Sequence, residues 1–219
     1  MKVFMEWTYV TRNKRETVWT SKEMNVEEAL AIAEDIEKTG RVKQLLFYDD
    51  RGVSWSKKEL AKLMKKVETE PHDVIAYFDG GYDRQSKKAG VGIVIYYKQN
   101  GAQFRMRANA QLDELQSNNE AEYAAFYFLL EQIEHLGVHH LPVVFRGDAH
   151  VVLHQLSNDW PVFSDEERWV ERIEQKMKKL RISPIYEPIN RKENSEADQL
   201  ATQALRGKII VSTIQLERE

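Results

Sequence analysis

The chain has 219 residues and a mass of 25.7 kDa, and its 42% hydrophobic and 31% charged residues are typical of a folded protein rather than a disordered one. It contains no cysteine, which excludes disulfides, thiolate zinc sites and thiol nucleophiles and leaves oxygen ligands for any metal. The formal net charge of -3 excludes the strongly basic field that marks many nucleic-acid-binding domains, so such binding must be argued from local features.

The start of the chain does not predict an export signal, because Lys2 and Glu6 interrupt any apolar run. No later stretch approaches the roughly 20 apolar residues that a membrane span needs. We therefore expect a cytoplasmic protein with no membrane association, and no protein partner can be predicted.

The first part of the chain predicts a small α+β domain with the element order ββαββα. Its elements are expected at residues 3–11, 15–20, 26–38, 42–48, 53–55 and from 57 onward. Asn25 and Ser56 are the expected helix caps. The acidic, proline-containing segment 68–73 is the expected boundary, so residues 1–70 form this domain and residues 71–219 a second one.

The second domain begins with three consecutive predicted strands and continues with alternating helices and strands. Its strands are expected at 74–78, 90–97, 104–110, 142–146 and 185–189, and its helices at 119–136, 149–156, 165–180 and 195–205. A meander followed by alternating strands and helices predicts an α/β fold, a mixed sheet flanked by helices.

Two acidic residues of this domain occupy positions that suggest chemistry. Asp79 ends an apolar strand and is followed by two glycines, so a ligand can approach the backbone beside its carboxylate; the alternative is an acid that opens a turn. Glu122 lies one helical turn before the apolar stripe that starts at Phe126. A carboxylate facing the core must be compensated, and a bound cation is one remedy.

Two further acidic residues each have a structural alternative. Asp148 follows an apolar strand and precedes a helix, which is where ligands gather in α/β sheets, but aspartate is also a favoured helix cap. Asp198 is able to complete a capping box that begins at Ser195. Neither residue predicts a site alone.

Together, four segments of residues 74–206 resemble the signature blocks of the type 1 ribonuclease H family, in the family's order. The resemblance implies the family's five-stranded mixed sheet with helices, which agrees with the element order above. The segments are Asp79-Gly80-Gly81, Asn118-Asn119-Glu120-Ala121-Glu122-Tyr123, Gly147-Asp148-Ala149 and Glu193-Asn194-Ser195-Glu196-Ala197-Asp198-Gln199-Leu200-Ala201.

The resemblance also implies a chemistry, the hydrolysis of the RNA strand of RNA/DNA hybrids by two Mg²⁺ or Mn²⁺ ions. Oxygen-only ligands suit these cations, and adjacent carboxylates cannot all ionise without one. In this scheme Asp79 bridges both ions, Glu122 and Asp148 hold the ion on the nucleophile side, and Asp198 holds the other. The residues expected to contact the hybrid are Gly80, Gly81, Asn118 and Asn119, of which the two asparagines have an alternative as loop and cap residues.

Three features depart from the family pattern. The loop 188–194 lacks the histidine that many members place there, and the six histidines of the chain are interpreted as surface or packing residues. The segment 157–165 lacks the basic residues of the longer handle that some relatives carry. Residues 1–70 do not match the hybrid-binding domain of some relatives, so the role of this domain is unknown.

Charge gives no further guide to the first domain. Residues 1–70 contain 14 Lys plus Arg and 13 Asp plus Glu, so the domain carries +1 and the remaining residues, with 18 and 22, carry -4. Lys58, Lys62, Lys65 and Lys66 lie off the apolar face of its last helix, where they either track phosphates or form a solvated face.

Two alternatives to hybrid cleavage therefore remain open. One is a ribonuclease H-like protein that binds or regulates nucleic acid with little or no catalysis. The other is a nuclease of the same superfamily that acts on another nucleic acid. A phosphatase or sugar-acting enzyme is disfavoured, because no nucleophile motif accompanies the carboxylates.

Overall fold

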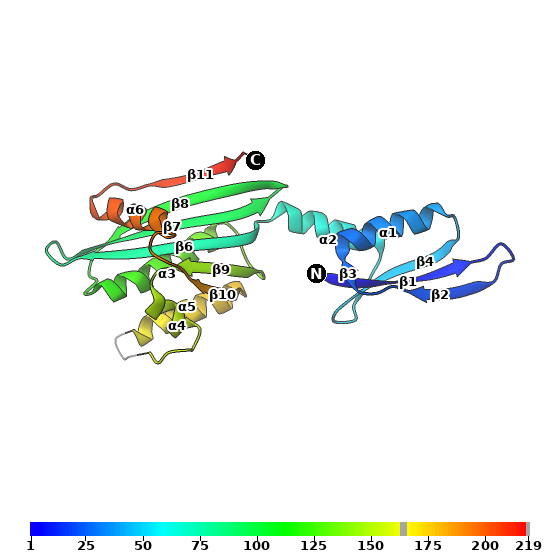
Figure 1. Ribbon diagram of the computed structural model, residues 1–219, viewed down its shortest axis with the longest axis horizontal. Coiled ribbons are helices and arrows are strands. Elements are labelled where there is room, and N and C mark those ends of the chain that lie inside the picture. Colours follow the sequence, from blue (N-terminus) through cyan, green and yellow to red (C-terminus); the bar gives the residue numbers. More distant parts are fainter. Residues whose placement is uncertain (163–165, 218–219) are drawn as a thin grey trace. The chain divides into compact units, whose positions relative to one another are not determined.

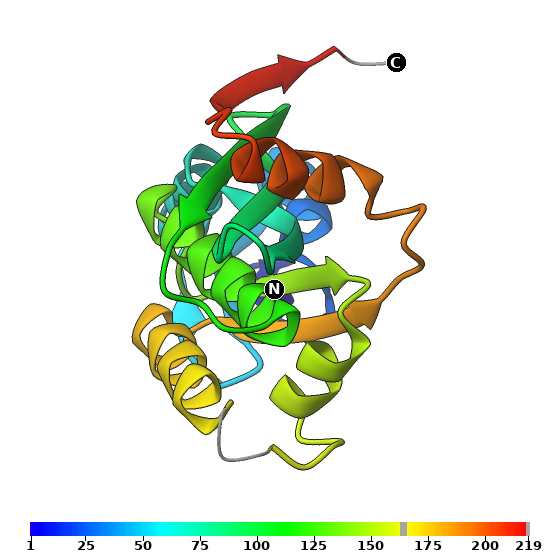
Figure 2. The same cartoon turned by 90° about the vertical axis from the view of Figure 1, so that its left-hand side faces the viewer.

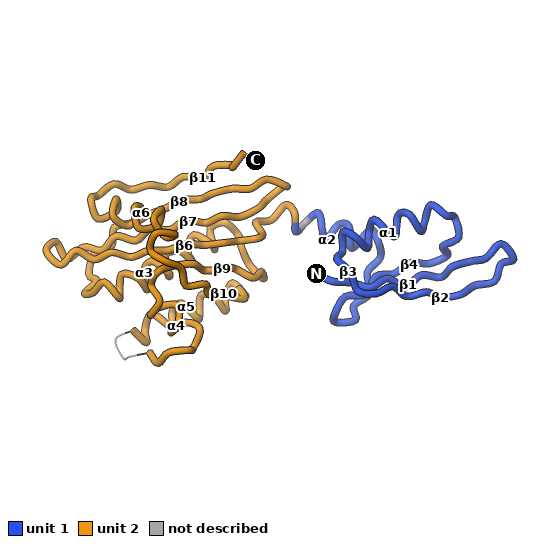
Figure 3. Tube along the Cα trace, in the orientation of Figure 1, with its two compact units in different colours: residues 1–67 blue, residues 68–219 orange. Residues whose placement is uncertain are grey.

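The computed structural model describes residues 1–162 and 166–217 of the chain. The chain forms two compact units, residues 1–67 and residues 68–219, which we call unit 1 and unit 2 (Figure 3). No helix among the described residues is long and apolar enough to cross a membrane.

Unit 1 is an antiparallel sheet with the strand order β2-β1-β4-β5, in which the short β3 pairs with β1. A small core contains Val3, Met5 and Phe47 of the sheet. Its elements are β1 (Lys2–Val10), β2 (Glu16–Thr20), β3 (Met24–Asn25), α1 (Val26–Lys38), β4 (Val42–Asp49), β5 (Ser54–Trp55) and α2 (Lys57–Thr69), whose last two residues belong to unit 2.

The two predicted helix caps of this unit differ in the structure. Ser56 and Glu59 form a reciprocal pair before α2, in which the Ser56 backbone N–H donates to the Glu59 carboxylate and the Glu59 N–H donates to the Ser56 hydroxyl. Asn25 occupies the cap position of α1, but its side chain makes no capping hydrogen bond.

Unit 2 follows the predicted order of elements and adds one strand (Figure 1). The helix predicted at 165–180 was expected to begin at Asp165, which lies outside the described residues. The elements are β6 (His72–Asp83), β7 (Lys88–Gln99), β8 (Ala102–Leu112), α3 (Asn118–His135), β9 (Pro142–Gly147), α4 (His150–Leu156), α5 (Glu167–Leu180), β10 (Ser183–Pro188), α6 (Ser195–Leu205) and β11 (Val211–Leu216).

The sheet of unit 2 has the strand order β10-β9-β6-β7-β8-β11. β9 runs parallel to β6 and β10, and the other neighbours are antiparallel. The predicted fold class, a mixed sheet flanked by helices, is confirmed. The sixth strand, β11, was not predicted; it pairs with β8 and extends the sheet at that edge.

Glycines set the distance between the sheet and the helices on its two faces (Figure 2). A Cβ at Gly80 of β6 would lie 2.6 Å from the backbone nitrogen of Glu122 in α3. A Cβ at Gly92 of β7 would lie 2.5 Å from the backbone nitrogen of Ala201 in α6. Gly80 pairs with Val91, one residue from Gly92, so the alternation along the strands places α3 and α6 on opposite faces. Both helices therefore touch the sheet backbone beside Asp79.

Candidate active site

The structure brings the four predicted carboxylates together. Asp79, Glu122, Asp148 and Asp198 line one cavity of about 210 Å³, which we call the carboxylate cavity. Gly80, Gly81, Asn118 and Arg191 line it too. The four acids come from β6, α3, the end of β9 and α6, so no short segment of the chain contains the site.

Parallel strand register explains why two of the acids meet. Tyr77 of β6 pairs with Arg146 of β9. Asp79 and Asp148 each lie two residues further along, just past the last parallel pair of β6 and β9. Asp148 follows the end of β9, where ligands gather in α/β sheets, whereas the prediction that Asp79 ends its strand is wrong, because β6 continues to Asp83 in pairing with β7. The strand pairing alone therefore brings these carboxylates to the same edge.

The close approach of α3 adds the third acid. The backbone N–H of Gly80 donates to Glu122 Oε2 over 3.0 Å, and a larger residue at Gly80 would push α3 away. Gly80 thus has a structural role beside the predicted substrate contact. On the opposite face, Gly92 gives α6 the same access, and α6 supplies Asp198.

Burial destabilises the ionised form of two of the acids, Asp79 and Glu122, and raises their pKa values. Burial, followed by repulsion from Asp148 and Asp198, raises the pKa of Asp79 to about 7. Burial, followed by repulsion from Asp79, raises the pKa of Glu122 to about 9. Arg191 lowers both values, but its effect is smaller. In the metal-free protein, protons therefore bind Asp79 and Glu122 near neutral pH, and a cation would compete with these protons by stabilising the ionised carboxylates.

Two residues that the sequence analysis did not single out hold the other two acids. Asn194, only 1% exposed, donates from Nδ2 to Asp148 Oδ1 over 2.6 Å and to the carbonyl oxygen of Phe78 over 2.8 Å. Arg191 donates to Asp198 Oδ1 over 2.9 Å. Asn194 therefore ties Asp148 to the strand that contains Asp79, and Arg191 neutralises Asp198.

The sequence left open that Asp148 caps a helix and that Asp198 completes a capping box with Ser195, and the structure contains neither arrangement. Ala149 occupies the cap position of α4, and no side chain caps that helix. Asn194 occupies the cap position of α6 without a side-chain hydrogen bond, and Ser195 is already helical. Neither acid caps a helix, so helix capping does not explain their positions in the cavity wall.

The predicted substrate residues lie in and beside the cavity. The cap of α3 is Ser117, which accepts from the Glu120 N–H, so the cap alternative for the two asparagines is wrong. Asn118 Oδ1 accepts from the Tyr82 N–H at the cavity wall. Asn119 donates to Glu166 Oε1 over 2.7 Å and lines a neighbouring cavity of about 330 Å³.

One histidine also lies beside the site. His150, at the start of α4, lines the neighbouring cavity with Glu122 and Asp148. Its Nε2 lies 3.2 Å from the carbonyl oxygen of Ile189 in the loop that lacks a histidine. The position of this ring is decided by the packing of α4 against that loop, and its sequence neighbours give no signal for it.

The chemistry of the donor set fits a divalent cation. Carboxylate oxygens are the ligands that Mg²⁺ and Mn²⁺ prefer, and a cation would offset the burial and the repulsion that raise the pKa of Asp79 and Glu122. Among the described residues, no three His, Asp or Glu side chains are arranged to hold an ion, and Asp198 is engaged by Arg191.

Comparison with known proteins agrees with this geometry. The sequence model of the family described as reverse transcriptase-like matches residues 77–204, which include all four acids. The chain belongs to this ribonuclease H-like family. The uncharacterized protein YpeP of Bacillus subtilis (strain 168) is 39% identical over 196 residues, covering 89% of this chain and 86% of that protein.

Solved structures of type 1 ribonucleases H share the fold of unit 2. RNase H1 from the halophilic archaeon Halobacterium salinarum NRC-1 is 25% identical, with a TM-score of 0.52, covering 61% of this chain and 98% of that chain. LC11-RNase H1, solved in complex with an RNA/DNA hybrid, is 24% identical, with a TM-score of 0.55, covering 62% and 98%. The resemblance to type 1 ribonuclease H inferred from the sequence is therefore confirmed.

Proposed function

We propose that this protein is a metal-dependent endonuclease that hydrolyses the RNA strand of RNA/DNA hybrids. The observation that carries the proposal is the convergence of Asp79, Glu122, Asp148 and Asp198 on one cavity within a ribonuclease H-like domain. The hybrid as substrate is supported by the likeness to type 1 ribonucleases H, of which LC11-RNase H1 has been solved with such a hybrid.

The four carboxylates would hold two Mg²⁺ or Mn²⁺ ions. Such ions, when bound, supply a Lewis acid for the scissile phosphate and an acidified water. The chain contributes the positions of its own groups. Asn194 fixes Asp148 to β6, and the Gly80 N–H orients Glu122 toward Asp79. Gly81, Asn118 and Asn119 are the proposed contacts to the hybrid.

Arg191 is the residue most able to modulate this site. Its guanidinium pairs with Asp198 and lowers the pKa of Asp79 and Glu122 through space. An ion held by Asp198 competes with this pair. Once released, the exposed guanidinium can donate hydrogen bonds to a phosphate oxygen of the substrate.

A hybrid cleavage assay in Mg²⁺ and in Mn²⁺ tests the proposal. Wild-type protein should cut the RNA strand and leave 5′-phosphate and 3′-hydroxyl ends. Asp79→Asn and Glu122→Gln should each lose at least about 10³-fold in rate, because each removes a ligand charge that the metals require. The matched control is Glu120→Gln, on the same helix, whose carboxylate instead accepts from the Gln116 N–H and Trp169 Nε1.

The control should keep cleavage within about threefold of wild type. Retained cleavage in Asp79→Asn would refute the assignment of the site. Tight hybrid binding without cleavage in either metal would select the nucleic-acid-binding alternative, which the Arg191–Asp198 ion pair favours because it occupies one ligand. Cleavage of double-stranded RNA or DNA in preference to the hybrid would select another superfamily nuclease.

A further inference from the structure

Unit 1, residues 1–67, contains 14 Lys plus Arg and 11 Asp plus Glu, a net charge of +3, and its charges are separated along the sequence. Residues 7–15 and 38–46 contain Arg12, Lys14, Arg15, Lys38, Arg41 and Lys43, and no acidic residue. The acids of the unit lie elsewhere, five of them between Glu27 and Glu37 on α1. Net charge therefore conceals a local concentration of positive charge.

The fold brings these two basic stretches to one end of the sheet. Tyr9 of β1 pairs with Val42 of β4, and the Val10 N–H donates to the Arg41 carbonyl oxygen over 2.8 Å. The tight turn between β1 and β2 closes with the Thr11 N–H donating to the Arg15 carbonyl oxygen. We call this region, made of Arg12, Lys14, Arg15, Arg41 and Lys43, the basic hairpin end.

Most of this charge is not neutralised within the unit. Lys38 pairs with Asp35, and Lys43 pairs with Glu16 over 2.8 Å. Arg12, Lys14 and Arg15 are exposed, and none of the ion pairs found among the described residues involves them. Three unpaired cations on four consecutive residues of a tight turn form a compact site for phosphate groups.

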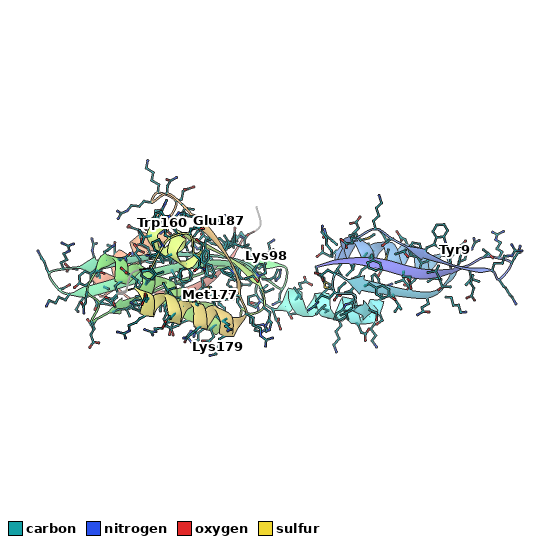
Figure 4. The ribbon with its side chains drawn as sticks, turned by 90° about the horizontal axis from the view of Figure 1, so that it is seen from below. Tyr9, Lys98, Trp160, Met177, Lys179 and Glu187 are labelled. Carbon is teal, nitrogen blue, oxygen red and sulfur yellow. The ribbon has the colours of Figure 1, made fainter. Side chains whose placement is uncertain are left out.

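Aromatic side chains accompany the cations. Trp19 of β2 is 55% exposed and lies opposite Trp7 of β1. Tyr9, labelled in Figure 4, accepts a 2.6 Å hydrogen bond from Arg41 Nη1. Trp19 lies on the same hairpin as the cations, four residues after Arg15. Exposed aromatic rings and positive charge on one element suit single-stranded nucleic acids, since their unpaired bases stack on aromatic rings while their phosphates follow the positive charge.

We propose that the basic hairpin end of unit 1 binds a single-stranded nucleic-acid segment, with Arg12, Lys14 and Arg15 on its phosphates and Trp19 stacked against a base. The idea that this binding tethers a substrate for unit 2 rests on the proposed function of unit 2. The binding of nucleic acid by the basic hairpin end does not rest on that function, and it is measured separately. A covalently linked second contact raises the effective concentration of substrate at the first.

Fluorescence anisotropy with the full chain tests the binding. The chain carries Asp79→Asn to prevent cleavage, and the probes are labelled single-stranded RNA, single-stranded DNA and an RNA/DNA hybrid of one sequence. The variant is Arg12→Glu with Lys14→Glu and Arg15→Glu. Its control is Lys58→Glu with Lys62→Glu and Lys65→Glu, which makes the same change in charge on exposed positions of α2.

The hairpin variant should bind single strands at least about tenfold more weakly, and the slope of log K against log salt should fall by about 2, since about 0.7 is lost for each phosphate contact. The control should stay within about twofold of the parent. Trp19→Ala should weaken binding about five- to tenfold at an unchanged salt slope, and Trp19→Phe should restore most of it.

Equal losses in the hairpin and control variants would overturn the proposal in favour of a general charge effect. Tighter binding of the hybrid than of single strands, with the same hairpin loss, would overturn the single-strand assignment. Binding to phosphatidylserine vesicles without binding to any oligonucleotide would identify a membrane surface instead. Circular dichroism melting of each variant verifies folding.

The outcome for unit 2 is independent. If a chain with an intact Asp79 cleaves the hybrid while the hairpin variant binds normally, only the inference about unit 1 fails. If that chain cleaves nothing while the hairpin variant loses binding to single strands, only the proposed nuclease activity fails.

Discussion

Each unit contains a buried aspartate, and the surroundings of the two aspartates shift their pKa values in opposite directions. Asp49 of unit 1 is 4% exposed and Asp79 of unit 2 is 8% exposed. Burial raises the pKa of Asp49, but hydrogen bonds from the Val53 N–H, Trp55 Nε1 and the Arg51 N–H outweigh it and hold the pKa below its usual value. Burial, followed by repulsion from the neighbouring carboxylates Asp148 and Asp198, raises the pKa of Asp79 to about 7, and among the described residues no hydrogen bond offsets it as at Asp49.

The difference shows that burial of an acid does not by itself indicate function. Asp49 organises a turn, because its oxygens satisfy N–H groups that would otherwise lack partners. Asp79 is placed by the sheet among like charges, which destabilises the metal-free protein and is useful only when a cation binds. Its neighbours, rather than its exposure, mark Asp79 as a candidate ligand.

The largest expected effect comes from breaking the contact that brings Glu122 to Asp79. Gly80→Ala places a Cβ 2.6 Å from the Glu122 backbone nitrogen, so α3 must move. We expect a loss of about 3 kcal/mol or more of unfolding free energy and of at least about 100-fold in hybrid cleavage. Denaturant unfolding and the cleavage assay measure these.

The adjacent glycine is the matched control. A Cβ at Gly81 meets only Leu205 Cδ1, at 3.4 Å, so Gly81→Ala should change stability by less than about 1 kcal/mol. A loss of cleavage in Gly81→Ala at unchanged stability would point to the predicted substrate contact. Equal destabilisation by both substitutions would contradict the role of Gly80 in seating α3.

The next effect is a pair of substitutions with opposite signs. In EDTA at pH 8, Asp79→Asn should raise the melting temperature by several degrees, because it removes a carboxylate that its neighbours repel. Asp49→Asn should lower it by several degrees, because an amide offers one acceptor oxygen where the carboxylate serves three N–H donors. Differential scanning calorimetry measures both melting temperatures. Shifts of the same sign would contradict the conclusion that Asp49 stabilises its unit and Asp79 destabilises its own.

Much of this site was predictable from local sequence. Asp79 ends the apolar run of β6, Asp148 follows the apolar strand β9, and Glu122 interrupts an apolar helical stripe, so their positions follow from the periods of strands and helices. Asp198 required the resemblance, because its place in the first turn of a helix is equally typical of a capping box. The mixed sheet was predictable for the same periodic reasons.

The groups around the acids were not predictable. Arg191 reaches Asp198 because of the loop conformation before α6, and Asn194 reaches the Phe78 carbonyl across 116 positions of sequence. Neither contact has a periodic signal. β11 is short and largely exposed, so its pairing with β8 decides its conformation more than its residues do. The basic hairpin end was not predicted, because residues 1–70 together carry a net charge of only +1.

A last expected effect is a pH dependence that differs between the units. Above about pH 4.5 the unfolded chain releases protons that the folded, metal-free protein keeps on Asp79 and Glu122, whose pKa values are about 7 and about 9. The folded state binds more protons, so stability falls as pH rises through this window, by on the order of 2–4 kcal/mol for Asp79 alone. Asp49 has the opposite effect, because its pKa is lowered in the folded state. It stabilises unit 1 at neutral pH, and this stabilisation is lost on acidification.

Hydrogen exchange in EDTA separates these responses, once the rates are corrected for intrinsic exchange. Peptides from β6 and α3 should lose protection between pH 6 and pH 9, whereas peptides from β1 and β4 should not. Saturating Mg²⁺ should flatten the slope in unit 2, because a bound cation keeps the carboxylates ionised in the folded state. A slope in unit 2 that Mg²⁺ leaves unchanged would mean that the raised pKa values of Asp79 and Glu122 do not report a cation site.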